Sequence, residues 1–462
     1  MDAYARYQSP FSWRYGSPEM RAVWSEENKR RLWRALWLAL AEAQVEFDLV
    51  TPAQVDELKA HALDVDVARA LEIEAVNQHD LMAELQVYAG QCPTAGGVLH
   101  LGATSMDIKD NAEVLQMRQS LDLLIPKLAA VLNVLADQVE TYAGQAVMAF
   151  THLQPAEPTT LGYRLAATAQ DLLADYQALT RLRGELQGKG FKGAVGTAAS
   201  YVMLYGLEGQ QRLEALIGQS LDLPFYEVTS QTYTRKQDYN LLCALSGLAA
   251  TAYKFAFDLR LLQSEVIGEL GEPFGQEQVG SSAMPFKRNP IQAEKVDSLA
   301  RALSAAPLTA WNNYANSLLE RTLDDSANRR TLFPEAFLAL DEILATLEKV
   351  ITGLRVNPSA MQANLDKFGP FAAIERLLMA AVKAGADRQA LHEVLRQLSM
   401  QAWAAVQQGQ PNPLADLAAG DARITRWLAP EAIAPLFDVS GYTGLAEQRA
   451  LEMAERVRAG CV

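Results

Sequence analysis

The stretch from Gly280 to Pro290 gathers several side chains that could do chemistry, and it lies between long segments with apolar residues at helical spacing. It contains two adjacent serines, a lysine beside an arginine, an asparagine and two prolines. Pro290 can begin a helix, because its fixed φ suits the first helical position. Ser281, Lys287 and Asn289 could therefore converge on an anion, together with backbone N–H groups near the helix start. The alternative interpretation is a solvated loop whose cations only keep it soluble.

Other polar interruptions hold three of the five histidines. Small hydroxyl donors and charged pairs in these segments can bind a carboxylate or a phosphate. A helix start, an N-cap and a core histidine bonded to a carbonyl explain the same residues structurally. No two histidines have the spacing of a zinc helix, and phosphate-loop and dinucleotide motifs are absent, so we expect no metal and no cofactor. The segments are His79 beside Asp80, His100 shortly before Thr104 and Ser105, and His152 among prolines that we expect to prevent regular structure.

Basic residues cluster at the predicted ends of long helices, although the chain is acidic, with 41 Lys and Arg against 55 Asp and Glu and a net charge of −14. A helix of about thirty residues is roughly 45 Å long, so the ends of antiparallel neighbours can meet. We expect one polyanion site built from distant segments, while the net charge argues against binding to nucleic acid or to an anionic membrane. The clusters are Arg14, Arg235-Lys236, Lys287-Arg288, Arg321 and Arg329-Arg330.

Apolar residues recur at the spacing of long packed helices in several segments. Residues 25–47 and 108–144 carry one apolar stripe each, and leucines repeat every seven residues from Leu165 to Leu186. From Leu241 to Val266 the apolar steps alternate between four and three. Because no alternation of strands and helices is evident, the sequence predicts an all-α fold with a central bundle of long helices.

Two further helices are predicted downstream, Ile291–Leu319 with a kink at Pro307 and Leu332–Leu354. The Gly- and acid-rich residues 268–279 are predicted to form a surface loop. After Asn357 the helical segments become shorter and are broken by Gly, Pro and Asp. A chain of 462 residues exceeds one typical core. The length predicts two or three domains, and the change of pattern places a domain boundary near Asn357.

Cysteine usage and hydropathy indicate a protein of the cytoplasm. Only three cysteines occur, and their spacing suits neither a disulfide framework nor a metal site. The first residues lack the charged and apolar regions of a signal peptide. The apolar run from Leu32 to Val45 contains Arg34 and Glu42 and is too short to cross a bilayer. We therefore expect a reducing compartment and no membrane segment.

The 280–290 stretch resembles the signature of the aspartase/fumarase superfamily, Gly-Ser-Ser-x-Met-Pro-x-Lys-x-Asn, and all seven of its fixed residues are present. Further segments resemble, in chain order, the adenylosuccinate lyase family. This resemblance implies an all-α fold in three domains, which we place at residues 1–108, 109–356 and 357–462. It also implies a homotetramer with active sites shared between subunits, and a small-molecule nucleotide as the substrate. The segments are Arg14-Tyr15, His79-Asp80, residues 100–105, Thr151-His152, residues 231–236 and residues 321–330.

The chemistry that the resemblance implies is a β-elimination of fumarate from adenylosuccinate, giving AMP, and from succinylaminoimidazole carboxamide ribotide. Such a reaction needs a base, an acid for the departing nitrogen and groups that hold the developing negative charge. By the resemblance, Ser281 is the base and His152 the general acid. His79 would hold or polarise the substrate, and Lys287 would favour the serine alkoxide.

The resemblance also implies which residues bind the substrate. The groups for the succinyl carboxylates would be Thr104, Ser105, Gln231, Lys287 and Asn289, those for phosphate and ribose Arg14, Tyr15, Arg321, Ser326 and Arg330, and further contacts Gln78, Asp80, Thr151 and Lys295.

Three positions depart from the commoner family pattern. Gln78 and Lys295 stand where arginine is frequent, and Phe286 stands where tyrosine or histidine is usual. At positions 78 and 295, these departures weaken any claim that the residue binds the substrate through a guanidinium group. A lysine can supply positive charge, but it cannot form the two parallel hydrogen bonds of an arginine. Argininosuccinate lyase and a catalytically silent scaffold are the alternatives. The arginine-rich residues 321–330, which suit a phosphate, argue against the first, and the presence of both Ser281 and His152 argues against the second.

Overall fold

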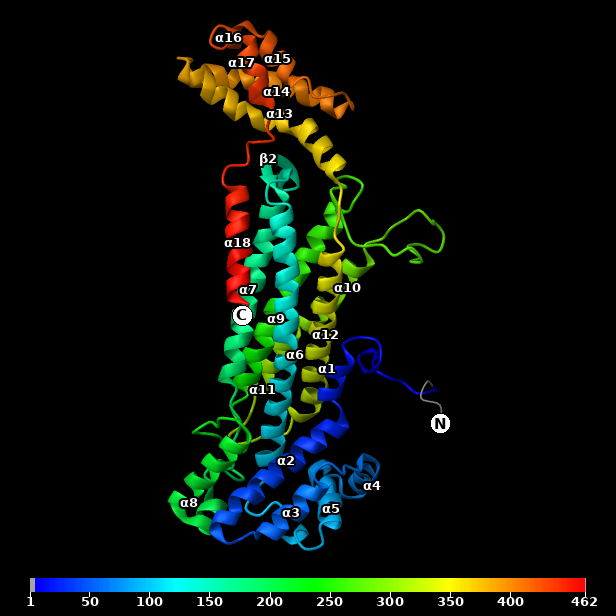
Figure 1. The fold of residues 1–462 in the computed structure, drawn as a ribbon, viewed down its shortest axis with the longest axis vertical. Helices are drawn as coiled ribbons and strands as arrows, with labels where there is room; N and C mark the ends of the chain where they lie inside the picture. Colours follow the sequence, from blue (N-terminus) through cyan, green and yellow to red (C-terminus); the bar gives the residue numbers. More distant parts are fainter. Residues whose placement is uncertain (1–4, 462) are drawn as a thin grey trace. The chain divides into compact units, whose positions relative to one another are not determined.

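The structure, a computed structural model, describes residues 5–461 and is built mainly of helices (Figure 1). The chain forms two compact units, one of Met1–Leu128, Asp175–Ala250 and Ser298–Ala345 and one of Ala129–Ala174, Thr251–Asp297 and Thr346–Val462. The division into three domains stays a prediction. Five long helices contribute residues to both units: α6 (Ser105–Thr141), α7 (Leu161–Glu185), α9 (Lys236–Leu262), α10 (Ile291–Leu303) and α12 (Ser326–Thr352).

Short helices with well-formed starts make up the N-terminal part of the first unit. Ser25 caps α2 (Glu26–Gln44) by accepting the Asn28 N–H, and Thr51 forms a capping box with Gln54 at α3 (Pro52–His61). These helices and α8 (Ala199–Ser220) pack on a core that includes Trp33 and Trp37 (Figure 1). The other elements are η2 (Pro10–Ser12), α1 (Pro18–Val23), η3 (Val45–Phe47), α4 (Val67–Asn77), α5 (Asp80–Gln91) and η4 (Gly96–Val98).

The predicted apolar stripes of the long helices are buried. Every leucine of the heptad series from Leu165 to Leu186 is at most 4% exposed, and α6 buries its predicted stripe with Pro126 inside the helix. The series in α9 ends earlier than predicted. The helix stops at Leu262, and Val266 is 89% exposed, so its inclusion in the stripe is wrong. Both α6 and α9 have the length and hydropathy of a membrane span, a property that core helices of soluble proteins share.

The predicted helix Ile291–Leu319 is two helices rather than one kinked helix. The first, α10, ends at Leu303, and α11 (Ala306–Ala315) begins with Pro307 in its first turn. Proline lacks the N–H that a continuous helix needs, yet it fits a helix start without cost. The second predicted helix is α12, which starts earlier than Leu332 and contains Pro334.

A β-hairpin occupies the segment around His152, where we predicted no regular structure. Strands β1 (Ala146–Thr151) and β2 (Gln154–Thr160) pair antiparallel, with Thr151 opposite Gln154. His152 and Leu153 form the two-residue turn, with φ values of 53° and 59°. Two consecutive turn residues with positive φ give a backbone twist that matches the twist of the two strands. Both strands of a two-stranded sheet are edge strands, and edge strands tolerate proline. The prediction was therefore wrong, and His152 sits at a defined turn.

The predicted surface loop 268–279 is buried over its first residues. Strand β3 (Leu270–Gly271) pairs with β4 (Arg355–Val356), and the carboxylates of Glu269 and Glu272 are buried. Exposed backbone resumes at Gly275. The surface-loop prediction is therefore wrong for residues 269–272, because the acidic side chains there bond inward.

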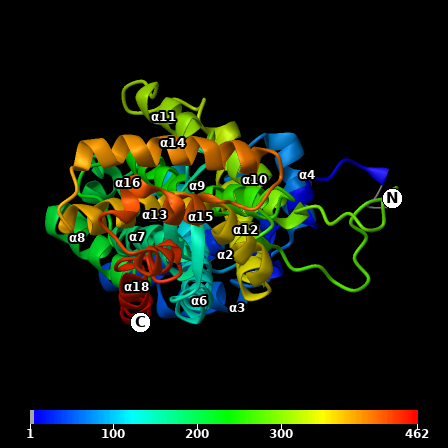
Figure 2. The same ribbon diagram turned by 90° about the horizontal axis from the view of Figure 1, so that it is seen from above.

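The prediction of shorter helices after Asn357 is wrong for the first of them, since α13 has 26 residues, and holds for the short helices that begin at Leu414. Asn357 caps α13, and the α13–α16 helices pack together around a core that includes Leu377 and Leu395 (Figure 2). The hairpin β1–β2 packs on α13 within the same unit. These elements are α13 (Pro358–Lys383), α14 (Arg388–Gln407), α15 (Leu414–Gly420), α16 (Ala422–Thr425), α17 (Pro430–Ile433), η5 (Ala434–Phe437) and α18 (Ala446–Gly460).

Two glycines of α7 test how closely its start packs. A Cβ on Gly162 would lie 2.6 Å from the Val139 carbonyl oxygen and 2.6 Å from the Cα of Ala143, both backbone atoms. We expect Gly162→Ala to cost about 1–3 kcal/mol of stability by overpacking, seen as a lower melting temperature. Gly184 has no atom within 4 Å of its added Cβ. Gly184→Ala should therefore raise the melting temperature through helix propensity, and equal effects of both variants would contradict the close packing.

Candidate active site

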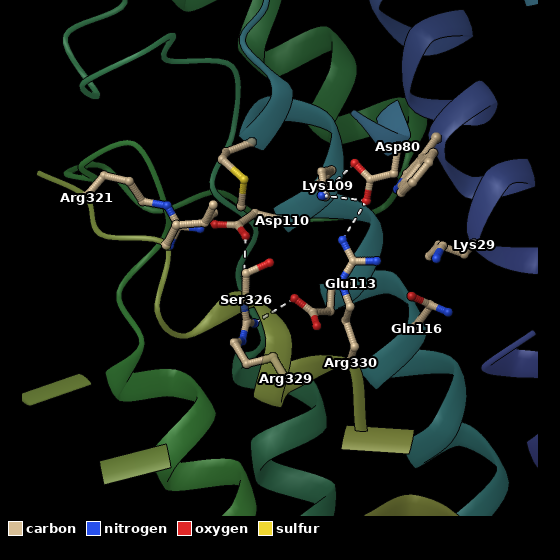
Figure 3. A pocket seen from close by; sticks show the side chains of 13 residues that line it. Lys29, Asp80, Lys109, Asp110, Glu113, Gln116, Arg321, Ser326, Arg329 and Arg330 are labelled. Carbon is tan, nitrogen blue, oxygen red and sulfur yellow. Dashed lines mark hydrogen bonds and ion pairs between the residues drawn. The ribbon is translucent and has the colours of Figure 1, made fainter. Parts of the chain in front are cut away.

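A pocket of about 110 Å³ in the first unit brings together four predicted binding residues, Asp80, Arg321, Ser326 and Arg330 (Figure 3). Asp80 is the first residue of α5, and Ser326 is the first residue of α12. The positive end of a helix dipole favours an anion, so these two helix starts suit a negatively charged ligand. The pocket lining consists of Lys29, Trp33, Asp80, Met106, Lys109, Asp110, Glu113, Gln116, Arg321, Leu323, Ser326, Arg329 and Arg330.

The carboxylate of Asp80 binds two cations that face the pocket (Figure 3). Lys109 Nζ donates to both oxygens at 3.0 and 2.9 Å, and Arg330 Nη2 donates to Oδ2 at 2.9 Å. Burial by itself would raise the pKa of Asp80, but the Lys109 ammonium, the Leu81 amide and Arg330 hold that pKa well below its usual range. Asp80 is therefore ionised at neutral pH and fixes both cations.

His79 connects the start of α5 to the start of α6. Its Nδ1 accepts the Met82 N–H at 3.3 Å as the N-cap of α5, and its Nε2 lies 3.3 Å from Ser105 Oγ. Because Nδ1 accepts a hydrogen, the neutral ring carries its proton on Nε2 and can donate to the serine. The structural interpretation of His79 as a helix start is confirmed, and its free edge faces a second predicted binding residue.

Asp107 fixes the Thr104-Ser105 segment. Its fully buried carboxylate accepts the N–H of Thr104 at 3.0 Å and that of Gly193 at 3.2 Å, and it pairs with the buried ammonium of Lys189. His100, in contrast, is half-buried and contacts the core residue Trp37. Its Nδ1 accepts from Trp37 Nε1 at 3.0 Å, and burial lowers its pKa.

Two residues of the predicted basic clusters are largely buried and paired with carboxylates of the protein. Arg329 Nη2 lies 2.6 Å from Glu113, 3.1 Å from Asp238 and 2.8 Å from the Tyr233 hydroxyl. Arg329 is only 5% exposed. Arg329 lines the pocket together with Arg321 and Arg330, but its charge is matched by carboxylates of the protein.

Arg235 is the second buried guanidinium. It donates from Nη2 to Asp110 at 3.1 Å and from Nε to Asp325 at 2.9 Å. The other oxygen of Asp325 accepts from Arg321 at 2.8 Å. Burial opposes ionisation of Asp325, yet Arg235, Arg329 and Arg321 together lower its pKa. Arg235 therefore acts through Asp325, which holds the pocket residue Arg321 in place.

In the second unit, the 280–290 stretch forms an exposed loop that folds on itself. Ser281 Oγ accepts the N–H of Met284 at 3.1 Å and that of Ala283 at 3.4 Å. Asn289 Nδ2 donates to the Gly280 carbonyl at 2.8 Å and closes the turn. A Cβ at Gly280 would lie 2.1 Å from the Lys287 carbonyl oxygen, so only glycine fits there. Backbone donors thus surround the Ser281 oxygen, while the Lys287 side chain is exposed.

Comparison with known proteins identifies the family. Residues 15–303 match the family model described as lyase, and residues 370–453 match the one described as adenylosuccinate lyase C-terminus. The chain is 42% identical over 424 residues to the adenylosuccinate lyase of Schistosoma mansoni, covering 90% of this chain and 88% of that protein. It is 39% identical to that of Saccharomyces cerevisiae, covering 99% and 95%. This chain belongs to the adenylosuccinate lyase family.

Solved structures share the fold of this family member. The 3-carboxy-cis,cis-muconate lactonizing enzyme from Pseudomonas putida superimposes with a TM-score of 0.86 at 24% identity, covering 98% of this chain and 100% of that chain. Fumarate lyase from Mesorhizobium gives 0.84 at 23%, with coverage of 98% and 100%. At such identities the likeness concerns the fold alone. The predicted all-α fold class is confirmed.

The remaining residues predicted from the family resemblance do not line the pocket of Figure 3. Gln78 is exposed and ends α4 with a φ of 57°, and the Arg14 guanidinium lies 5.8 Å from the Trp13 and Tyr15 ring centres. Their roles stay predictions. The residues outside this pocket are Arg14, Tyr15, Gln78, His79, Thr104, Ser105 and Gln231 in the first unit, and Thr151, His152, Ser281, Lys287, Asn289 and Lys295 in the second.

Several pocket residues were not predicted from the sequence. Lys109 had a usable signal, since it follows Ser105 by four residues and therefore lies on the same helical face. Lys29 and Glu113 had none, because only tertiary packing brings them to the pocket. Within residues 5–461, no group of three or more His, Cys, Asp and Glu side chains could hold a metal ion.

One side chain, that of Gln263, connects the two ends of the 273–287 loop. Gln263 Oε1 accepts the Glu272 N–H at 2.8 Å, and Gln263 Nε2 donates to the Arg288 carbonyl at 3.0 Å. The Glu272 carboxylate in turn accepts the N–H groups of Gln292 and Ala293 at the start of α10. Burial raises the pKa of Glu272, while these backbone donors oppose that rise. Gln263 therefore holds the two ends of the 273–287 loop together.

We expect Gln263→Ala to speed amide hydrogen exchange at Glu272 and through the loop to residue 288, because both bridging hydrogen bonds are lost. Gln276→Ala is the matched control, since that side chain is exposed in the same loop. Exchange measured by mass spectrometry should change in the first variant only. Identical exchange in both variants would contradict the bridge.

Proposed function

We propose that this chain is a C–N lyase that removes fumarate from adenylosuccinate, giving AMP, and from succinylaminoimidazole carboxamide ribotide. The observation that carries the choice of substrate is the cation-rich pocket at the starts of α5 and α12. Arg321, Ser326 and Arg330 offer guanidinium and hydroxyl donors there, which suits a nucleotide phosphate. Family membership supports the reaction type.

In the proposed reaction, a base removes a proton from the carbon next to a substrate carboxylate. The electron pair forms the carbon–carbon double bond of fumarate, the C–N bond breaks, and an acid protonates the departing nitrogen. We assign the base to Ser281 and the acid to His152. A serine hydroxyl is a weak acid, but the N–H groups of Ala283 and Met284 that bond Ser281 Oγ would stabilise its alkoxide. The Lys287 ammonium would add positive charge beside it.

The proposal assigns the other predicted residues to binding. His79 Nε2 lies 3.3 Å from Ser105 Oγ and would orient that hydroxyl toward a succinyl carboxylate. The remaining assignments rest on the family resemblance. Thr104, Gln231 and Asn289 would complete the carboxylate sites, Arg14 and Tyr15 would contact phosphate or ribose, and Gln78, Asp80, Thr151 and Lys295 would make further contacts.

We also propose that the protein is a homotetramer of the cytoplasm. Apolar side chains at and beyond α11 support association, since Leu308, Trp311 and Leu319 are 66%, 49% and 92% exposed. Light scattering should give the mass of four chains, and Trp311→Glu should lower that mass. A wild-type protein that stays monomeric at micromolar concentration would contradict the tetramer.

The proposed function is tested by mixing the purified protein with adenylosuccinate and following its absorbance together with fumarate release. We expect equimolar fumarate and AMP. Argininosuccinate serves as the competing substrate, because an argininosuccinate lyase would cleave it instead. No turnover of adenylosuccinate, or turnover of argininosuccinate alone, would overturn the proposal.

The base is tested with Ser281→Ala, which should lower kcat by about 10²–10⁴-fold while the protein still binds AMP. Ser282→Ala is the matched control, since the neighbouring hydroxyl is exposed. It should retain most of the wild-type activity. If Ser282→Ala were the inactive variant and Ser281→Ala the active one, the base would be Ser282.

A further inference from the structure

The carboxylate of Asp80 faces more positive charge than it can neutralise. Lys109 and Arg330 both donate to it, so one negative charge stands against two positive charges. The Asp80 side chain is 9% exposed and that of Lys109 is 24% exposed, so water screens this group only in part. The surplus cation is a feature of a site that receives an anion.

The other carboxylates of the pocket do not remove this surplus. Asp110 is bonded by Arg235, and Glu113 is paired with Arg329. Lys29, a further cation of the lining, has its own partner in Glu26 at 2.6 Å. Lys109 and Arg330 therefore share Asp80 as their single carboxylate partner within the part of the chain that the structure describes.

Lys109 lies between two segments that the proposed function uses. Lys109 follows Ser105 by one helical turn on α6. Its Nζ donates to the same carboxylate as Arg330, which lies at the beginning of the second turn of α12. Asp80 thus presents an ammonium and a guanidinium side by side toward the pocket (Figure 3). This arrangement fits the oxygens of one dianionic group, because each cation can bind a separate oxygen.

We propose that Lys109 is a further ligand of the nucleotide phosphate, binding one phosphate oxygen while Arg330 binds another, with Asp80 as the residue that positions both. This inference rests on the proposed function, which supplies the nucleotide. It assigns to Lys109 a direct contact with the ligand, whereas a purely structural Lys109 would only neutralise the buried Asp80.

The test compares binding of AMP and adenosine, which differ by the phosphate, to the full-length protein. Lys109→Met removes the charge, and we expect it to weaken AMP binding by about 10- to 100-fold while adenosine binding stays unchanged. Lys109→Arg keeps the charge and should restore most of the AMP affinity. Lys59→Met is the matched control, an exposed lysine on α3 outside the pocket, and should bind both ligands like the wild type.

Lys109→Gln provides a second neutral variant, since its amide can still donate to Asp80 and so preserves the structural role. It should lose AMP affinity as Lys109→Met does. Unchanged AMP affinity in Lys109→Gln, or an equal loss for AMP and adenosine, would overturn the inference. If either result is found while the wild-type protein still releases fumarate from adenylosuccinate, only the inference about Lys109 fails and the proposed function stands. An inactive wild-type protein would overturn the proposed function itself.

Discussion

Two buried carboxylates and one half-buried carboxylate at the start of α6 are the constraint on which the first unit depends. Asp107, Asp110 and Glu113 recur every three residues, so they project from successive turns of one helix. A buried charge without its partner costs about 3–5 kcal/mol, so segments that are distant in sequence must supply cations to this helix. Asp107 forms an ion pair with Lys189, Asp110 with Arg235, and Glu113 with Arg329. The same pairs fix the backbone near Thr104 and the start of α12, which is why the pocket residues meet.

The 273–287 loop is held by hydrogen bonds rather than by buried ion pairs. Its anchors are a few neutral hydrogen bonds, from Gln263 at the base and from Asn289 at the turn, and its side chains are largely exposed. Segments with few buried contacts open at low free-energy cost, which fits the role in catalysis that we propose for this loop. The protein therefore combines a candidate pocket that buried ion pairs hold in place with a loop, residues 273–287, whose anchoring hydrogen bonds lie near its ends.

Much of the fold could be read from apolar spacing, and the failures have local physical causes. The leucine repeats of α7 predicted its buried face because heptad spacing needs no knowledge of neighbours. Val266 fitted the same spacing but lies beyond the end of α9, since spacing does not record where a helix stops. The prolines near His152 concealed a hairpin, because a two-stranded sheet leaves the proline nitrogens at its edges.

The sequence by itself determined the chemical inventory of this protein: the serine loop, the histidines, the basic segment at 321–330 and the family that this combination indicates. Only the tertiary structure decided which of these groups can meet a ligand. Arg329 and Arg330 are adjacent and chemically identical and both line the pocket, yet the side chain of the first is 6% exposed and paired with several carboxylates, whereas that of the second is 53% exposed. Lys109, in contrast, carried no motif and reaches the pocket beside Asp80. The reason is that charge is a property of a residue, whereas desolvation and pairing are properties of its surroundings.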